Sequence, residues 1–357
     1  ERPGEGDETR QWSPPSFADG TAAYFATVNR NKKSLTVDMA KPEGQALLRQ
    51  LAAAADIVVE NFKVGGLKKY GLDYDSLKQS NPGLIYASLT GFGQTGPDAA
   101  KPGYDYIIQG LSGLMSITGP ADGLPHKVGV AVVDLFAGLQ LTIGIQAALI
   151  ARAQTGLGQQ VDVSLLDSAV AMSANVGMNC LASGSVPPRL GNAHPNIVPY
   201  QVFEAAHGQH LILACGNDKQ FAAIGRVMGQ EWHTEPRFAT NPQRVAHRDE
   251  LVPLMQAVFG HKTRDEWIAL FEAAQVPCGP INNIAEALAM PQVQQRGMVV
   301  DFADSPVKVL GNPIKLSATP VQYHSAPAAL GAHSAEILRG LGYSEEQIVQ
   351  WRADGVV

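Results

Sequence analysis

The sequence predicts an α/β protein in which helices cover a largely parallel sheet and a smaller α+β domain is inserted into the larger one. Strand-like and helix-like segments alternate over the first half of the chain, which is typical of parallel sheets. The length of 357 residues exceeds the size at which a single core keeps growing. After a turn-rich stretch at 184–188, the pattern changes to a hairpin followed by helices.

The first half supplies the elements of the larger domain. Leu47, Leu48 and Leu51 lie on one stripe of a helix that starts at Pro42. The loop 91–97 is rich in glycine and separates the second strand from the next helix. Periodicity predicts strands over 56–60, 84–90 and 159–165, and helices over 42–55, 104–115, 134–153 and 167–183.

The sequence pattern of the second half predicts a small inserted domain, after which the chain returns to the large domain. Strands over 200–204 and 209–215 meet at His207-Gly208, and a strand over 298–302 follows later. Helices are expected over 219–228, 251–259 and 264–274, and from His333 and Ser344 near the end of the chain. We therefore expect a large domain at 1–185, a small domain at 186–290 and a return to the large domain at 291–357.

Composition excludes several classes of function. The formal charge of -6 and the lack of a Lys/Arg block argue against binding to nucleic acid or to an anionic membrane. The apolar run 128–150 is interrupted by Asp134, Gln140 and Gln146, so we expect a buried core helix rather than a bilayer span. Three cysteines at wide spacing indicate reduced thiols and a cytoplasmic protein. No signal peptide is visible, and the chain starts at Glu1 without Met, so we expect an upstream segment.

Asp167 is the strongest candidate for chemistry that the residues themselves indicate. It follows the alternating strand pattern of Val161, Val163 and Leu165 and opens a helical segment. The unpaired N–H groups at a helix start favour an ionised carboxylate, which is the form a nucleophile needs. The alternative is an ordinary Asp helix cap, which is among the commonest caps.

Two basic segments could meet an anionic ligand. Asn29-Arg-Asn-Lys-Lys-Ser34 precedes a strand-like segment at 35–38, and Lys68 and Lys69 follow a pair of glycines. Solvated surface turns are the alternative for both. Gly91-Phe-Gly-Gln-Thr-Gly96 is not followed at once by a helix, so we do not expect a dinucleotide site. The nine histidines show no metal-ligand spacing, and Ser164 and Ser168 lack the glycines of a hydrolase elbow.

Ordered motifs over nearly the whole chain are similar to the family III CoA-transferases, the CaiB/BaiF family. They run from Glu1-Arg-Pro-Gly4 to Pro277-Cys-Gly-Pro280, with matches between them at 29–34, 59–62, 91–97, 103–105, 112–115 and 155–159. Within the family, the segments 191–194, 198–203 and 276–283 most resemble the branch that acts on succinyl-CoA and glutarate.

The resemblance implies a fold, an assembly and a set of site residues. The fold is a large Rossmann-like domain built from both chain ends plus a small inserted domain, with two subunits interlocked as a homodimer. The family's catalytic aspartate falls on Asp167. Its CoA-contacting positions fall on Arg2, Val37, Asn61, Phe62, Gly66, Lys69, Tyr70 and Lys101.

This chain departs from the family pattern in three places. Lys69 stands where a relative has arginine, which keeps the charge but gives up bidentate phosphate contact. Ala40 replaces a lysine, although Lys41 is adjacent. The family's first strand and helix would precede Glu1.

The implied reaction moves CoA from an acyl-CoA, such as succinyl-CoA, to a carboxylic or dicarboxylic acid through an aspartyl-CoA thioester. Acyl-CoA and the acid are substrates, and no permanently bound cofactor or metal is expected. Backbone amides would stabilise the oxyanions, with 216–220 as a candidate loop. A plain strand-to-helix turn is the alternative for this loop. Arg189, Lys127 and Arg152 are candidates for binding the distal carboxylate of a dicarboxylate.

Two alternatives remain open. An α-methylacyl-CoA racemase would share the fold, but its histidine falls on Tyr104, which is a poor base at neutral pH. A non-catalytic acyl-CoA-binding protein would need no poised aspartate and would still bind after Asp167→Asn.

Overall fold

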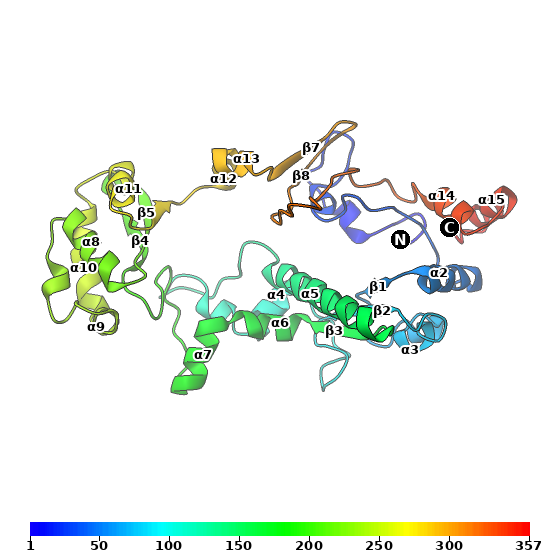
Figure 1. The fold of residues 1–357 in the computed structure, drawn as a ribbon, viewed down its shortest axis with the longest axis horizontal. Helices are drawn as coiled ribbons and strands as arrows, with labels where there is room; N and C mark the ends of the chain where they lie inside the picture. The colour runs from blue at the N-terminus through cyan, green and yellow to red at the C-terminus, as the bar shows by residue number, and fades with distance from the viewer.

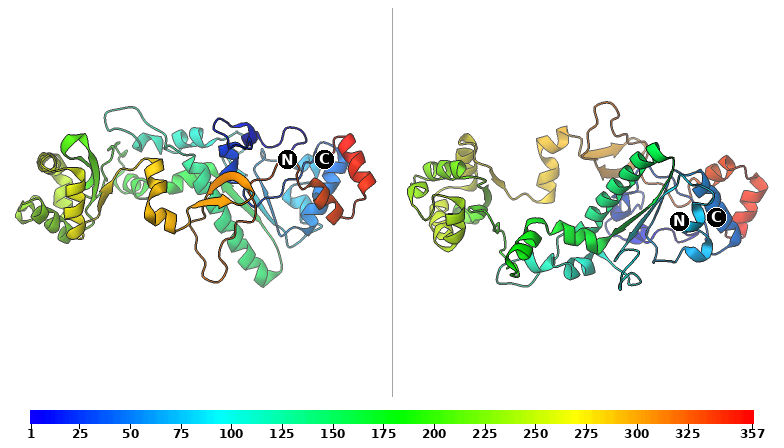
Figure 2. Two further views of the ribbon diagram at one scale, coloured as in Figure 1. Left: turned by 90° about the horizontal axis from the view of Figure 1, so that it is seen from above. Right: turned by 60° about the horizontal axis from the view of Figure 1, so that its bottom comes forward.

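The computed structural model describes all of residues 1–357, and it has the elongated shape shown in Figure 1. Both termini lie close together at one end of the molecule, and a separate helical and sheet unit lies at the other. Two segments of chain connect these parts, one leaving the large domain and one returning to it (Figure 2). The chain thus traces a ring, closed where its two ends pack together, rather than a compact globule.

The large domain is organised around a three-stranded parallel sheet. Its strands are β1 (Ile57–Glu60), β2 (Ile85–Thr90) and β3 (Gln160–Ser164), in the order β1-β2-β3. Thr90 pairs with Ser164, so the two strands end at the same edge of the sheet. The expected parallel arrangement is confirmed, and the carboxyl ends of the strands are brought together.

Helix α5 (Val132–Thr155) packs on β2 and β3, with Val133, Ala137, Leu141 and Ala148 buried. It ends at Gly156, whose left-handed φ of 73° suits a glycine. The expectation of a buried core helix is only half right. The opposite face exposes Leu135, Leu139, Ile143 and Ile150 at 52–66%. By length and composition α5 could also cross a membrane, and it is the one helix in the structure for which this holds.

The two ends of the chain share one core. Helices α14 (Ser334–Gly340) and α15 (Glu345–Ala353) pack against α2 (Pro42–Ala54). Leu47, Leu338 and Ile348 are almost fully buried there. The strand expected at 35–38 is wrong: the amides of Val37 and Asp38 donate to the carbonyls of Glu1 and Val356 instead of to a neighbouring strand.

The single helix expected at 167–183 is two helices, α6 (Leu165–Met172) and α7 (Ala174–Ser183). The break lies at Ala174, which has a positive φ of 45°. The Ser173 hydroxyl donates to the carbonyl of Val170, a local bond that competes with helix continuation. Helix α6 therefore ends at Met172, and α7 begins as a separate helix at Ala174.

The small domain contains an antiparallel sheet and four helices. The hairpin of β4 (Tyr200–Glu204) and β5 (His210–Ala214) is confirmed, and β6 (Cys278–Pro280) joins it. Its helices are α8 (Asp218–Val227), α9 (Asn241–Ala246), α10 (Arg248–Phe259) and α11 (Arg264–Ala273). A core of 17 buried residues includes Phe203, Phe259 and Trp267.

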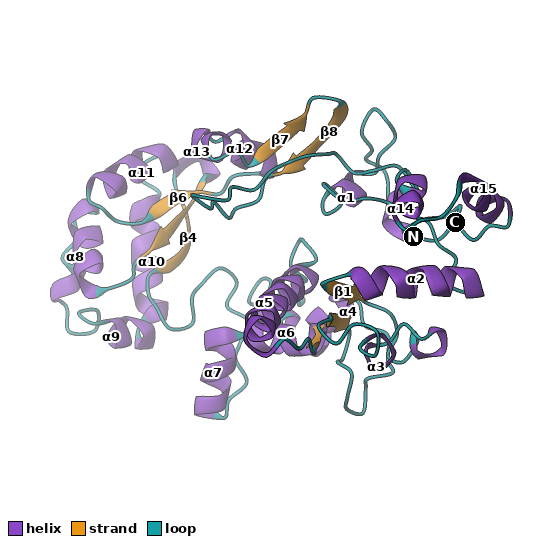
Figure 3. Ribbon diagram, turned by 45° about the vertical axis from the view of Figure 1, so that its right-hand side comes forward, coloured by secondary structure: helices purple, strands orange, loops and turns teal.

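The remaining elements are short or connect the domains. The return segment holds α12 (Ile284–Ala289), α13 (Pro291–Gln295) and the hairpin of β7 (Val299–Phe302) and β8 (Ser305–Leu310), as Figure 3 shows. Helix α1 (Ala23–Ala26) packs near β8, α3 (Tyr74–Leu77) lies between β1 and β2 in sequence, and α4 (Asp105–Leu111) precedes α5.

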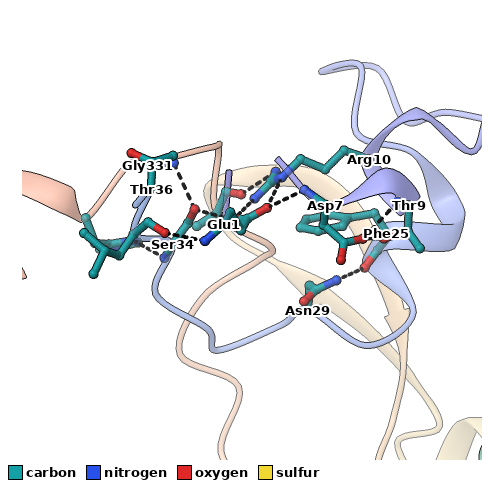
Figure 4. A network of polar contacts seen from close by, with 12 residues as sticks. Glu1, Asp7, Thr9, Arg10, Phe25, Asn29, Ser34, Thr36 and Gly331 are labelled. Atoms are coloured by element: carbon teal, nitrogen blue, oxygen red, sulfur yellow. Dashed lines mark hydrogen bonds and ion pairs between the residues drawn. The ribbon is translucent and has the colours of Figure 1, made fainter. Parts of the chain in front are cut away.

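Glu1 lies at the centre of a polar network that joins the N-terminal segment to Ser34 and, through Arg10, to Ala328 in the C-terminal part of the chain (Figure 4). Its carboxylate accepts bonds from Nε and Nη2 of Arg10 at 2.7 and 2.8 Å, and from the Ser34 hydroxyl. Arg10 also donates to the carbonyl of Ala328 and stacks over Phe25. Burial opposes ionisation of Glu1, but the bonds from Arg10 and Ser34 outweigh it and lower the pKa of Glu1 to about 2.

Because the pKa of Glu1 falls from 4.5 to about 2 on folding, its contribution to stability is complete above pH 4.5 and is lost as the pH falls toward 2. We expect Glu1→Gln to lower the unfolding free energy by about 1–3 kcal/mol at pH 7, and by about a quarter of that at pH 2.5. Urea unfolding at several pH values measures this. An equal loss at both values would contradict the assignment.

Arg244 is a fully buried cation in the small domain. It donates to the carbonyls of Val198 and Phe238 and pairs with Asp218 at 2.7 Å. Asp218 is half exposed, so the main loss in Arg244→Ala comes from the two carbonyls that lose their donor and from the space left in the core. We expect this variant to destabilise the domain by about 3–5 kcal/mol. The control is Arg237→Ala, whose half-exposed ion pairs should contribute less than about 1 kcal/mol. The fluorescence of Trp232 and Trp267 during urea unfolding reports on this domain, and similar losses for both variants would be inconsistent with the role given to the buried guanidinium group.

Candidate active site

Three helices begin at the carboxyl edge of the parallel sheet, and each carries an aspartate in its first turn. Asp105 opens α4, Asp134 is the third residue of α5, and Asp167 is the third residue of α6. The helix starts are packed together by Ile108, Val133, Ala137, Leu165 and Ala169, which form one buried cluster. Ligands of open α/β sheets bind at this edge, so it is the natural place for a site.

Asp167 lies just beyond β3, as the strand-to-helix pattern predicts, but it does not cap the helix. The cap is Ser164, whose hydroxyl accepts a 2.9 Å bond from the amide of Asp167. The alternative interpretation of Asp167 as an N-cap is therefore wrong, because the helix begins two residues earlier, at Leu165. Its side chain is exposed and lies in the positive field of the helix start.

Asp134 is a second carboxylate at this edge, and the sequence analysis did not assign it a role. Partial burial, with a smaller contribution from the nearby charge of Asp105, raises the pKa of Asp134 from 3.8 to about 6, although the side chain still reaches solvent. Strongly perturbed acids concentrate at functional sites. The sequence did carry a signal for this residue, because Asp134 is an acid that interrupts an apolar run at the point where a helix begins.

The glycine loop after β2 passes close to the start of α4. A Cβ on Gly91 would lie 2.6 Å from the Cα of Gly103, so neither position accepts a side chain without moving backbone. Two of the loop amides are engaged: Gly93 donates to the hydroxyl of Thr90, and Gln94 donates to Asp162. These bonds and the close contact of Gly91 with Gly103 fix the path of the loop at the sheet edge.

Five of the expected CoA-contacting positions follow β1 at the same edge: Asn61, Phe62, Gly66, Lys69 and Tyr70. Asn61 and Phe62 are exposed, and the ammonium group of Lys69 lies 4.6 Å from the ring centre of Tyr70. Beneath this segment is a polar cavity of about 220 Å³ lined in part by Lys63, Lys68 and Ser88. The structure thus brings an exposed aromatic ring and several cations to the site edge.

The other three expected CoA-contacting positions differ in their exposure and in the residues that they contact. Lys101 lies in the loop before α4 and pairs with Asp98 at 2.7 Å. Arg2 is exposed and pairs with Glu5. Val37 is only 7% exposed and packs in the core shared by the chain ends, so its side chain is not presented to a ligand.

Of the three cations expected to bind the distal carboxylate of a dicarboxylate, two already form other contacts with distant segments of the chain. Arg152 bonds to Asp56 and to the carbonyl of Gly83 at the opposite edge of the sheet, about 27 Å along α5 from Asp134. All three nitrogen groups of Arg189 donate to carbonyls of the segment 116–123. Lys127 is exposed in the segment that leads into α5.

The loop at 216–220 in the small domain forms a strand-to-helix turn. The Asn217 side chain accepts the amide of Gln220, and the Gly216 amide donates to the side chain of Gln220. These two amides are therefore not free to stabilise an oxyanion within a single chain. No group of three or more His, Cys, Asp or Glu side chains is placed to hold a metal ion.

Comparisons with known proteins agree with this architecture. The sequence model of CoA-transferase family III matches residues 1–334. A succinate–glutarate CoA-transferase of Agrobacterium fabrum is 49% identical, and the match covers 96% of this chain and 87% of the relative. A succinyl-CoA:glutarate CoA-transferase of Mus musculus is 39% identical over 100% of this chain and 83% of its own length.

A solved structure agrees as well. The crystal structure of a CaiB/BaiF family protein from Brucella suis superposes with a TM-score of 0.83 at 48% identity, covering 96% of this chain and 90% of that one. The resemblance stated from the motifs is confirmed, and the chain belongs to CoA-transferase family III, whose members transfer CoA.

Proposed function

We propose that this enzyme moves CoA between dicarboxylates of the succinate and glutarate class through an aspartyl-CoA intermediate, with Asp167 as the nucleophile. The observation that carries the proposal is the exposed carboxylate of Asp167 in the first turn of α6, just beyond β3 and at the same sheet edge as Asn61 and Phe62. The names of the two relatives support the dicarboxylate class.

The chemistry needs one carboxylate and no redox step. The carboxylate attacks the thioester carbonyl of the donor, which gives a mixed anhydride and releases the CoA thiolate. The thiolate then attacks the aspartyl carbonyl, which forms the aspartyl-CoA thioester and frees the donor acid. The acceptor carboxylate attacks this thioester to form a second anhydride and release the thiolate. Attack of the thiolate on the acceptor carbonyl gives the new acyl-CoA and restores the aspartate.

The local geometry supports Asp167 as that carboxylate. Its side chain is exposed in the first turn of α6, and the N-terminal field of that helix favours the anion that each thioester exchange regenerates. The motif resemblance points to the same residue. Asp134 serves as the comparison, because it is a second carboxylate at this sheet edge and burial raises its pKa to about 6.

Intact-protein mass spectrometry after mixing with succinyl-CoA tests the proposal. The unmodified protein and Asp134→Asn should gain a CoA-sized mass that hydroxylamine removes, whereas Asp167→Asn should gain none. An adduct lost only in Asp134→Asn would move the nucleophile to that residue. If no variant forms an adduct while CoA thioesters still bind, α-proton exchange in deuterated water would test the racemase alternative, and its absence would favour a non-catalytic binder.

We also propose that two copies interlock as a homodimer in the cytoplasm. One chain exposes 20478 Å², whereas a compact monomer of this mass exposes about 14,000 Å². Much of this excess comes from the open shape in Figure 1, and the apolar outer face of α5 is the kind of surface that an obligate interface covers. The three free cysteines fit a reducing compartment.

Interlocked rings cannot exchange subunits unless one ring opens. We therefore expect tagged and untagged dimers, mixed under native conditions, to form no mixed dimers over a day, and to form them readily after denaturation and refolding. Native mass spectrometry measures the species directly. Mixed dimers that form within minutes, or a stable monomer, would contradict the proposed assembly.

A further inference from the structure

We infer that Lys127 is a specificity-determining residue, whose ammonium group binds the distal carboxylate of a dicarboxylate while the other end of the substrate reacts at Asp167. This role rests on the proposed function, because a distal carboxylate is present only if the substrates are dicarboxylates.

The carboxyl edge of the parallel sheet is rich in acids, so an anionic substrate needs a cation there. Asp105, Asp134 and Asp167 all lie in the first turns of helices that are packed together at this edge. These charges repel a substrate with two carboxylates, and only one of the two takes part in the reaction. A cation that meets the second carboxylate would offset the repulsion and fix the orientation of the substrate.

Lys127 is the free cation on the side of this edge formed by α4 and α5. Its side chain is exposed, and its ammonium group donates to the carbonyl of Val128 at 3.1 Å and pairs with no carboxylate. Lys101, in the loop before α4, already forms an ion pair. Arg189 has every nitrogen bound to a carbonyl, and Arg152 lies at the far end of α5. Two of the three N–H groups of the ammonium therefore remain for a ligand.

Contacts on both sides of Lys127 hold its backbone in place. On one side, the amide of Val128 donates to Oε1 of Gln109 at 2.9 Å, and Gln109 is fully buried on α4. On the other side, the amide of His126 donates to the carbonyl of Thr118 at 2.9 Å and closes a loop. Lys127 thus lies between two fixed points just ahead of α5, whose first turn is at the site edge.

Arg189 supports the same loop from the segment between the two domains. Its Nε and Nη1 donate to the carbonyls of Pro120 and Ser116 at 2.7 and 3.1 Å, and its Nη2 donates to the carbonyl of Gly123. One planar guanidinium group therefore gathers three carbonyls, which the single ammonium group of a lysine would not reproduce in the same geometry. Arg189 is thus a positioning residue for Lys127 and does not itself bind the substrate.

Matched substrates with and without a distal carboxylate test the role of Lys127. Glutarate and pentanoate differ in that group, and so do the donors succinyl-CoA and butyryl-CoA. In Lys127→Met, the ratio of kcat/KM for the dicarboxylate to that for the monocarboxylate should fall by about 10- to 100-fold, the contribution of one charged hydrogen bond. Lys127→Arg keeps the charge and should keep most of the wild-type preference.

A charge reversal gives a gain of activity that partial unfolding cannot imitate. In Lys127→Glu, 5-aminopentanoate, which carries an ammonium group in place of the distal carboxylate of glutarate, should become a better acceptor than it is for the unmodified protein. The matched control is Lys315→Met, which removes another exposed lysine whose ammonium group donates to a nearby carbonyl at 3.1 Å. This control should leave every substrate ratio unchanged.

Hydrogen exchange separates substrate binding from support of the loop and does not require activity. Amide exchange of the peptide 116–128 should speed up in Arg189→Lys, because carbonyl contacts are lost, and should stay at the wild-type rate in Lys127→Met. Arg189→Lys should also weaken the preference for glutarate, since Lys127 is then held less firmly.

An unchanged substrate ratio in Lys127→Met, or no gain with 5-aminopentanoate in Lys127→Glu, would overturn the inference. Failure of the proposed function gives a different result in the adduct assay. If the CoA adduct that depends on Asp167 forms from succinyl-CoA, and Lys127→Met forms it with the same kcat/KM, only the role of Lys127 fails. If the unmodified protein forms no such adduct, the proposed function fails, and the role of Lys127 fails with it.

Discussion

The parallel pairing of β2 with β3, with α5 packed across both, is the constraint on which the site depends. It brings Thr90 and Ser164 to one edge and makes α5 start at that edge, because the helix runs back along the strands before β3. Two of the three first-turn acids, Asp134 and Asp167, owe their positions to this arrangement. The third, Asp105, follows the glycine loop, in which the backbones of Gly91 and Gly103 lie in close contact. A site of this kind is assembled by strand ends and helix starts rather than by a single loop.

The molecule divides its stability between two cores of different character. The small domain buries 17 residues and a fully enclosed guanidinium group, all from one continuous stretch of chain. The large domain uses several smaller clusters, and one of them joins residues from opposite ends of the sequence. Its longest helix exposes Leu135, Leu139, Ile143 and Ile150. The proposed second subunit would cover this apolar face of the large domain.

The order of strands and helices was largely predictable, because local periodicity determines it. The positions at 42–54, 85–90 and 200–214 agree closely with expectation. The misses have tertiary causes. The segment at 35–38 has strand character but bonds to the chain ends, and the helix at 167–183 breaks at Ala174. The pKa of Asp134 is raised first by burial and then by Asp105, which is distant in sequence, so no local pattern could reveal the shift. The buried state of Val37 likewise depends on helices about 300 residues later.

The core shared by the chain ends has a consequence for the order of folding. The small domain draws its contacts from neighbouring residues and can form early, whereas Leu47 meets Leu338 and Ile348 only after almost the whole chain is available. Closure of the ring is therefore expected to be the last and slowest step, and during synthesis it must wait for α14 and α15 to leave the ribosome. Truncation of the last helices would leave a chain whose small domain is folded but whose ring never closes.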